Sequence, residues 1–464
     1  MDNFEVHGSW WLPGGVPTTG KLSFSEDGLV LTLYGALLDQ EGPSEGPSGV
    51  SEWGILPIIH GRDQKQRPIT LIDSYGMISQ WPDLQEQTFD ANLAVVGEHL
   101  PHAEFSGIRS DFDHLADWVG APSISRRQAD PRGTFVDTKV TESVATTWRT
   151  ASLAIRSGVV GSSNESHVSV NRWCAFSAEP DSPQAWSDLL EAYLRPFHDL
   201  LILSLGKSLR MVDVELRPAE GEKWHPVYFR TLTPRNVPTP ASISASTAPT
   251  LLTAGLASLP LAQLLPSWFD LHEDLQPVLA LLHAPFYAPF IYSAHRYASF
   301  FQSLEAYHKV KKNEFGSKDV PKGEHQERVA QVVAALEAAG LPDAHVQWAR
   351  NVIRGRNDKP LKEQIIDVVS STGVLGQRIL EEVPDFPTVV SRARTGVSHG
   401  GADKGASVSR RHWCGEVLLW VMRVRLLEDL GIAESAARVL RNPRFQFALE
   451  QLSTGTQQSG DVDS

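Results

Sequence analysis

The spacing of apolar residues changes once along this chain, and this change constrains the fold more than any other feature. Before residue 230, apolar residues alternate with polar ones or form short runs bounded by Gly, Pro, Ser or Asp, which is typical of β-strands. After residue 270, they recur every three or four residues, as in helices with one buried face. We therefore expect an α+β protein, in which an antiparallel β-rich N-terminal domain precedes an all-α bundle.

Short strands are predicted throughout the β-rich part. Leu22–Phe24 and Leu29–Leu33 flank Asp27-Gly28, a dipeptide that readily adopts the positive φ angles of a hairpin turn. A helix is expected from the N-cap and first-turn proline Ser182-Pro183 to Leu205, with a kink at Pro196. The other predicted strands are Leu56–Ile59, Ile69–Ile72, Leu93–Val96, Thr134–Val140, Ser152–Ile155, His167–Cys174, Met211–Leu216 and Val227–Leu232.

A segment without charged side chains separates the two parts. Residues 236–269 are rich in Pro, Ser, Thr and Ala. A transmembrane helix needs about 20 continuous apolar residues, and the prolines exclude one here. We expect a linker over residues 236–268, helical from near Leu259, between a domain over residues 1–235 and a helical domain over residues 269–451. Residues 452–464 are predicted to be a flexible tail.

The helical part contains several predicted amphipathic helices. One helix is expected to start at Pro387 and to end at Gly400, because glycine commonly follows a helix. Gly340 is expected to end another in the same way. The remaining predicted helices are Tyr292–Lys312, Glu324–Ala339, Asp343–Arg354, Leu361–Val369 and His412–Leu430.

Charge is distributed unevenly between the two parts. The whole chain has 42 Lys+Arg and 55 Asp+Glu, a net charge of −13. Residues 291–464 hold 23 basic and 21 acidic side chains, net +2, which leaves 19 and 34 for the first 290 residues, net −15. Residues 391–425 are locally basic, as a phosphate-binding surface requires. The alternative is a solvated helix face whose acidic partners lie elsewhere. The cations of this segment are Arg392, Arg394, Lys404, Arg410, Arg411, Arg423 and Arg425, against Asp403 and Glu416.

Other sequence features argue for a cytoplasmic protein without cofactor or metal. Cys174 and Cys414 make no disulfide framework, and the N-terminus lacks the basic and apolar regions of a signal peptide. His99 and His102 have a spacing seen in metal sites, but no Cys or carboxylate set completes it. Trp10-Trp11 is expected to contribute to the core, because adjacent strand residues point to opposite faces.

The segment from Ser391 to Gly400 carries the residues best suited to chemistry. It places Arg394 five residues before His399, and Arg392 seven residues before it. On an ideal helix Arg392 and His399 share a face, whereas Arg394 lies about 140° away, a gap that a long guanidinium or a frayed last turn can close. Arginine binds phosphate and histidine exchanges protons near neutral pH. Together they suffice to cleave RNA through its own 2′-hydroxyl; the alternative is a histidine that caps helix-end carbonyls.

These motifs resemble the ApeA-like anti-phage proteins of the HEPN (higher eukaryotes and prokaryotes nucleotide-binding) superfamily. The late helix reads Arg394-Thr-Gly-Val-Ser-His399, and an earlier helix, Phe300-Phe-Gln-Ser-Leu-Glu-Ala-Tyr307, is similar to the acidic first helix of that family. The family often has Asn after the motif arginine, where this chain has Thr395. The segments that resemble the ApeA N-terminal domain are Gly8-Ser-Trp-Trp11, Ile58-Ile-His-Gly61, Thr70-Leu-Ile-Asp73 and Phe112-Asp-His-Leu-Ala-Asp-Trp118.

The resemblance implies a metal-independent endoribonuclease that acts in abortive phage defence. His399 would act as general base or acid in attack by the 2′-hydroxyl on the adjacent phosphate, and Arg394 would stabilise charge on the phosphate oxygens. The products would be a 2′,3′-cyclic phosphate and a 5′-hydroxyl end. HEPN domains usually dimerise, so we expect a homodimer or larger homo-oligomer. The expected partners are RNA, with tRNA as one candidate, and a phage protein that triggers the acidic N-terminal domain.

Further residues are expected to support this site. Glu305 would orient Arg394 or His399 from the facing helix, unless it is a surface residue paired with Lys309. Thr395 and Ser398 could bind phosphate, although helix-end hydroxyls also bond the backbone. Two other interpretations are a non-catalytic module that holds nucleotide or RNA, and a structural protein whose bundle mediates assembly. Arg392 is a further supporting residue, and the cations expected to bind RNA are Lys404, Arg410 and Arg411.

Overall fold

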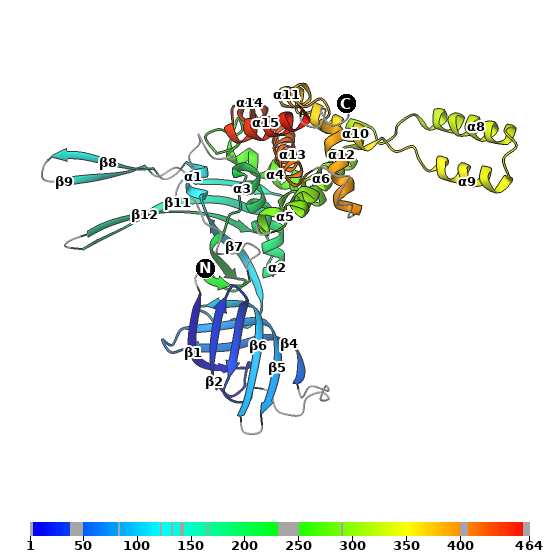
Figure 1. Ribbon diagram of the computed structural model, residues 1–464. Coiled ribbons are helices and arrows are strands. Elements are labelled where there is room, and N and C mark those ends of the chain that lie inside the picture. The colour runs from blue at the N-terminus through cyan, green and yellow to red at the C-terminus, as the bar shows by residue number, and fades with distance from the viewer. Residues whose placement is uncertain are drawn as a thin grey trace. The chain divides into compact units, whose positions relative to one another are not determined.

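The computed structural model describes residues 3–37, 50–81, 84–120, 123–130, 133–139, 143–164, 167–230, 250–288, 291–399 and 407–457 (Figure 1). The chain divides into two compact units. The first comprises Met1–His272 with Phe286–Pro289, and the second comprises Glu273–Pro285 with Phe290–Ser464. The first unit is built mainly of antiparallel strands and the second of helices, which confirms the predicted α+β class.

Six antiparallel strands of the first unit close into a barrel. Pairing runs in the order β6-β3-β2-β1-β4-β5, and β5 pairs back with β6. Closure leaves no unpaired strand edge, which removes a route to aggregation. The strands are β1 (Phe4–Trp11), β2 (Thr18–Ser25), β3 (Gly28–Leu33), β4 (Val50–Asp63), β5 (Pro68–Trp81) and β6 (Leu84–Val96).

Trp10 fills the interior of this barrel. Its side chain is 0% exposed, and it lies opposite Gly61 in the β1–β4 register. A Cβ atom at Gly61 would lie 2.1 Å from Cε3 of Trp10, so the indole ring occupies the space that a side chain would need. The adjacent Trp11 contacts the imidazole rings of His60 and His99, with ring centroids 6.4 and 5.2 Å apart. The predicted core role is thus confirmed for Trp10.

The predicted hairpin around Asp27-Gly28 forms, but its turn lies one residue earlier. Ser25 pairs with Gly28, so Glu26 and Asp27 are the two loop residues. Gly28 opens β3 with a φ of 127°, a conformation that strongly favours glycine.

A second group of antiparallel strands extends the sheet in the order β10-β11-β12-β7-β14-β15, and β15 also pairs with β6. β8 and β9 form a separate two-stranded ribbon. The sequence patterns gave no range for five of the strands, which are β1, β7, β8, β10 and β13. The strands are β7 (Glu104–Phe112), β8 (Ser123–Asp130), β9 (Gly133–Lys139), β10 (Val144–Trp148), β11 (Ala151–Asn164), β12 (His167–Glu179), β13 (Gln184–Ala185), β14 (Met211–Pro218) and β15 (His225–Tyr228).

The helix predicted from Ser182 to Leu205 begins later and has a different irregularity. Gln184 and Ala185 pair with β7 as β13, so the helix starts at Trp186. It continues as α2 (Trp186–Leu189), a π-helical turn η1 (Leu190–Leu194) and α3 (Arg195–Leu205). The π turn ends two residues before Pro196, whose missing N–H and ring would disturb a regular α-helix at this point. α1 (Leu115–Val119) is a short helix after β7.

Part of the predicted linker is packed against the first unit. Leu251 and Leu252 are buried, and the Leu251 N–H donates to the Ser204 carbonyl at 2.8 Å. α4 (Leu261–Asp274) begins within the predicted linker. The indole N–H of Trp268 in α4 donates to the Pro196 carbonyl at 2.7 Å. Residues 250–268 therefore belong to the folded unit, because their apolar side chains are buried there.

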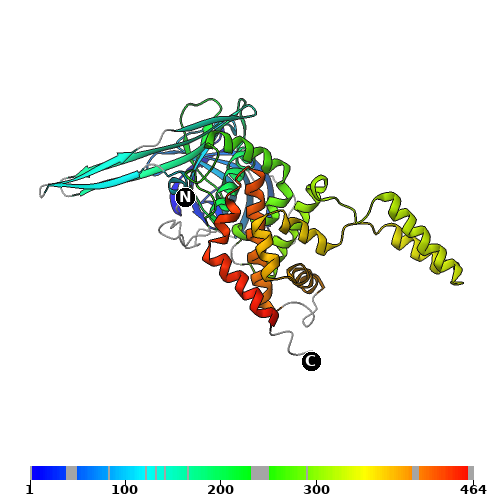
Figure 2. The same ribbon diagram turned by 90° about the horizontal axis from the view of Figure 1, so that it is seen from above.

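The second unit is a helical bundle around the long helix α13. α13 packs against α6, α15, α14, α12 and α10, and Figure 2 shows α13 and α15 side by side. α15 extends six residues into the predicted tail, because Leu452 is fully buried. No described helix has the length and apolar character needed to cross a membrane. The helices are α5 (Gln276–Tyr287), α6 (Ser293–Val310), α7 (Lys312–Phe315), α8 (Lys322–Ala338), α9 (Asp343–Arg354), α10 (Leu361–Ser370), α11 (Val374–Glu382), α12 (Phe386–His399), α13 (Val408–Asp429), α14 (Ser435–Leu440) and α15 (Pro443–Gln457).

Asp111 of β7 makes the stability of the first unit depend on pH. Burial, together with the charges of Asp213 and Asp113, raises the pKa of Asp111 to about 7, although the Phe112 N–H donates to it at 2.7 Å. Between the unfolded pKa near 4 and this folded pKa, the folded state holds a proton that the unfolded state has lost. The free energy of unfolding should therefore fall by roughly 2–4 kcal/mol as the pH rises from about 4 to 7.

Asp111→Asn tests this effect, because an amide oxygen can still accept the Phe112 hydrogen bond without carrying charge. At pH 8 we expect the variant to be more stable than the wild type in urea denaturation, and at pH 4 to be of similar stability. A difference in stability between the two proteins that is the same at pH 4 and pH 8 would contradict the raised pKa of Asp111.

Candidate active site

The helix α12 carries the predicted Arg/His motif on its second half. Its buried face consists of Phe386, Val389, Val390 and Ala393, a spacing of three and four residues that anchors one side of the helix in the bundle. Arg394 follows this buried face and is partly buried, whereas Arg392 is exposed. The two candidate arginines therefore lie in different environments, which their sequence spacing alone did not distinguish.

Glu305 on α6 lies within electrostatic range of Arg394 on α12. The Glu305 side chain is partly buried, and this burial raises its pKa, while the positive charge of Arg394 opposes the shift. The described residues Glu305 and Lys309 form no ion pair within 4 Å, and Lys309 is exposed. Arg394 is thus the charged residue that acts on Glu305, although these two described side chains form no ion pair within 4 Å either.

Tyr297 joins the helices that carry these residues. Its hydroxyl donates to the Val390 carbonyl of α12 at 2.6 Å, and the side chain is almost completely buried. Burial raises the pKa of Tyr297, as do Cys414 and Glu305, whereas Arg394 and Arg411 lower it. Groups on α6, α12 and α13 therefore act electrostatically on this one phenol. The sequence showed Tyr297 only as a member of an apolar helix face, and its hydrogen bond between helices had no local signal.

The start of α13 supplies two more of the predicted cations. Ser407 caps this helix by accepting a hydrogen bond from the Arg410 N–H at 3.2 Å. Arg410 also pairs with Asp385, with Nη2 and Oδ2 3.4 Å apart. Arg411 is partly buried and acts electrostatically on Tyr297. Cys414, one turn further, is buried, and this raises the pKa of its thiol to about 12, which makes it a poor nucleophile.

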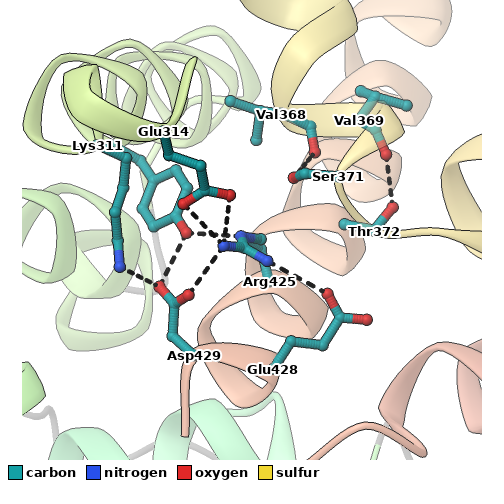
Figure 3. Close-up of polar contacts among 10 residues, drawn as sticks. Lys311, Glu314, Val368, Val369, Ser371, Thr372, Arg425, Glu428 and Asp429 are labelled. Carbon is teal, nitrogen blue, oxygen red and sulfur yellow. Dashed lines mark hydrogen bonds and ion pairs between the residues drawn. The ribbon is translucent and has the colours of Figure 1, made fainter. Parts of the chain in front are cut away.

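Two arginines counted in the predicted basic segment do not belong to a phosphate-binding surface. Arg423 is 1% exposed and lies over the Trp420 ring, and burial lowers its pKa to about 9. Arg425 is surrounded by acidic partners, with which it forms the network shown in Figure 3. The predicted phosphate-binding role does not apply to these two residues, because Arg423 is buried and Arg425 is paired with acidic groups both one turn away and more than 100 residues away.

The network around Arg425 ties α13 to α6 and α7. Arg425 Nε donates to the Tyr307 hydroxyl at 2.7 Å, and its Nη2 lies 2.8 Å from Glu314 and 3.0 Å from Asp429. The Tyr307 hydroxyl in turn donates to Asp429 at 2.8 Å, and Lys311 pairs with the same carboxylate at 3.1 Å. Figure 3 shows these groups converging on one guanidinium, which is therefore structural and already neutralised.

Several predicted residues cannot be placed in full. The backbone of α12 is helical through His399, so Thr395, Ser398 and His399 lie on its last turns. Their side chains lie outside the part of the chain that the structure describes. Lys404 lies outside the described residues altogether.

The histidines singled out for their spacing have other roles. His99 Nε2 lies 2.8 Å from the Gly61 carbonyl, and its ring stacks on that of His60 at 5.0 Å between centroids. His102 is exposed. Among the described residues, no group of three or more His, Cys, Asp or Glu side chains gathers in a way that could hold a metal ion.

Comparisons with known proteins agree with this architecture. The family model described as ApeA N-terminal domain 1 matches residues 5–268, and the one described as Apea-like HEPN matches residues 298–436. The first match covers more than half of the chain, and the second includes most of α6 and all of α12 and α13. A search of curated proteins and a search of solved structures each found no match. The chain therefore belongs to the ApeA-like HEPN proteins, a family of anti-phage proteins.

Proposed function

We propose that this protein is a metal-independent endoribonuclease that acts in abortive phage defence. The observation that carries the proposal is the placement of Arg394 near the partly buried Glu305, on a helix that continues to His399. The Apea-like HEPN match spans all three positions. HEPN domains are typically RNases, so the family and the arrangement of charges support the same chemistry.

The proposed mechanism divides the work between two side chains. His399 removes the proton from the 2′-hydroxyl, whose oxygen attacks the adjacent phosphorus. Arg394 binds the non-bridging oxygens and stabilises the negative charge that develops on them. The bond from phosphorus to the 5′-oxygen breaks, and that oxygen takes up a proton. The RNA is left with a 2′,3′-cyclic phosphate and a 5′-hydroxyl end, without consumption of water.

The end chemistry of the products tests this proposal. Purified protein is incubated with total RNA, including tRNA, in the presence of a metal chelator. We expect new 5′ ends that polynucleotide kinase labels without prior phosphatase treatment, and 3′ ends that ligate only after the cyclic phosphate is removed. Binding of RNA without any new ends would favour the alternative, a non-catalytic HEPN module. Cleavage that the chelator abolishes would contradict the metal-independent mechanism.

Glu305 is proposed to hold the Arg394 guanidinium in its productive position. Glu305→Gln removes the negative charge but keeps the size of the side chain. We expect kcat, the rate at which bound RNA is cleaved, to fall by roughly 10- to 100-fold. The reason is that a misplaced guanidinium no longer matches the charge of the transition state. The melting temperature should not fall, since the substitution removes a carboxylate whose burial is unfavourable. A lowered melting temperature with unchanged kcat would instead indicate a structural role.

Regulation and assembly complete the proposal. The acidic first unit is proposed to restrain the nuclease until a phage protein binds it, and two chains are proposed to pair through their HEPN domains in the cytoplasm. Deletion of residues 1–235 should then raise RNA cleavage or toxicity. This deletion leaves α4 without the unit against which it packs, and so exposes its apolar side chains. A second deletion that also removes residues 236–272 lacks this exposed surface and serves as the matched control. Inactivity of both deletions would contradict restraint by this unit.

A further inference from the structure

The helices α8 and α9 form a hairpin with a groove along it. Hydrogen bonds close the base of the hairpin: Asn357 accepts from the Val320 N–H at 3.3 Å and donates to the Val320 carbonyl at 3.0 Å. Gly340, with a φ of 72°, allows the turn at the other end. The groove has a volume of about 660 Å³. It is lined entirely by residues from the two helices.

The groove is cationic at one end and apolar along its floor. Lys322 and His325 from the first turns of α8 and Arg354 from the end of α9 line the cationic end. The floor consists of Val329, Ala330 and Val333. The ligand that fits this arrangement carries negative charge next to a flat or apolar group.

Lys322 and Arg354, the two permanently charged residues at this end, differ from the other cations of the hairpin in having no acidic partner. Elsewhere on the hairpin, Lys318 pairs with Asp358 at 2.6 Å, and Arg328 pairs with Glu324 at 2.7 Å. Arg350 pairs with Glu337 at 3.1 Å, at the far end of the groove. Within the described part of the chain, neither Lys322 nor Arg354 has a carboxylate within 4 Å. Their charges are therefore available to an anion.

The start of α8 adds to the positive potential at the same end. α8 is a 17-residue helix whose N-cap, Pro321, offers no side-chain hydrogen bond to the first N–H groups. Such a helix end carries a partial positive charge and has unpaired donors. Lys322 and His325 lie in the first turn, and Glu324, the acidic residue of that turn, is paired with Arg328. The helix end and the unpaired Lys322 therefore favour an anion at one place.

We propose that this groove binds a single strand of RNA, with phosphates held by Lys322 and Arg354 and a base lying on the apolar floor. The inference rests on the proposed function, in which RNA is the substrate, and adds a second place at which the protein holds it. An apolar helix of another protein would bury both cations without partners, which is unfavourable. A second copy of this hairpin offers Glu337 as the acidic residue of its groove, and that residue is already paired with Arg350.

RNA binding measured apart from cleavage tests this assignment. The full-length chain with His399→Ala is titrated into a fluorescently labelled single-stranded RNA of 20 nucleotides, and anisotropy is recorded at several salt concentrations. In this background, Lys322→Gln/Arg354→Gln should weaken binding by about 10-fold. It should also reduce the slope of log K against log salt by about 1.4, because two phosphate contacts of single-stranded RNA are lost.

Matched variants separate the groove from general charge. Lys318→Gln/Arg328→Gln removes the same charge from paired cations of the same hairpin that do not line the groove, and should leave affinity nearly unchanged. Ala330→Glu places an anion on the groove floor and should weaken binding by a similar factor to Lys322→Gln/Arg354→Gln. Trp348→Ala alters an exposed side chain that does not line the groove, and should have no effect.

Each contrary result overturns the assignment in a recognisable way. Equal losses in the two double variants would show that only total charge matters. A large loss in Trp348→Ala with none in Ala330→Glu would place RNA outside the groove. Free adenosine monophosphate that binds as tightly as the RNA strand, and loses affinity in Lys322→Gln/Arg354→Gln, would make the ligand a mononucleotide.

The same experiment distinguishes failure of this inference from failure of the proposed nuclease. If the wild type cleaves RNA but Lys322→Gln/Arg354→Gln binds it normally, the groove assignment is wrong and the nuclease stands. If the wild type does not cleave RNA but the double variant loses binding, the nuclease proposal is wrong and the groove stands.

Discussion

Replacing His399 with Ala is expected to lower the rate of RNA cleavage by about 10²- to 10⁴-fold, the range that a positioned general acid or base contributes. Arg394→Ala should lower it by about 10²- to 10³-fold, because a preorganised cation that stabilises an oxyanion is worth a similar factor. Both effects are expected in single-turnover kinetics with saturating protein, where neither weaker binding nor slow product release obscures the chemical step.

Arg392→Ala is the matched control for this prediction. Arg392 lies on the same helix, two residues away, but its side chain is exposed, whereas Arg394 is partly buried and acts on Glu305 and Tyr297. We expect Arg392→Ala to change cleavage by less than about 10-fold, as for a solvent-exposed phosphate contact. A large loss in Arg392→Ala with none in Arg394→Ala would assign the role to the other arginine. Wild-type rates in both Arg394→Ala and His399→Ala would exclude the proposed mechanism.

Trp10→Ala should destabilise the barrel by about 3–5 kcal/mol, the usual cost of removing a large aromatic side chain from a core. The indole is fully buried, and the residue opposite it, Gly61, has no side chain that could fill the space left by the ring. The cavity would therefore persist in the variant instead of being closed by a neighbour. Urea denaturation followed by circular dichroism measures this change as a lower midpoint of the transition of the β-rich unit.

Trp11→Ala provides the comparison for the barrel. Trp11 is only partly buried and contacts His60 and His99 by the edges of the rings. Edge-to-face ring contacts contribute about 0.5–1.5 kcal/mol each beyond area burial, so we expect a smaller loss than for Trp10. Equal midpoints for Trp10→Ala and Trp11→Ala would contradict the central position of Trp10 in the core.

Local patterns predicted several helices well, but they gave no range for α5, α11, α14 or α15, and they said little about how the helices pack. The range predicted for α9, Asp343–Arg354, agrees with the structure at both ends, because a helix is encoded in neighbours three and four residues apart. α13 begins at Val408, four residues before the predicted start, since Ser407 caps it through a hydrogen bond that apolar spacing does not reveal. The hairpin near Asp27 was predicted from a dipeptide, but strand register moved its turn by one residue.

The sequence by itself determined the α+β class, the placement of a β-rich part before a helical part, and the presence of Arg394 and His399 on one helix. Only the tertiary structure decided that β5 pairs back with β6 to close the barrel, that Arg425 is neutralised and that Arg394 lies near Glu305. The reason is the range of the interactions. Periodicity operates over a few residues, whereas the hydrogen bonds of Arg425 with Tyr307 and Glu314 join positions 118 and 111 residues apart. Which cations remain available to an anionic ligand is therefore set by packing between helices.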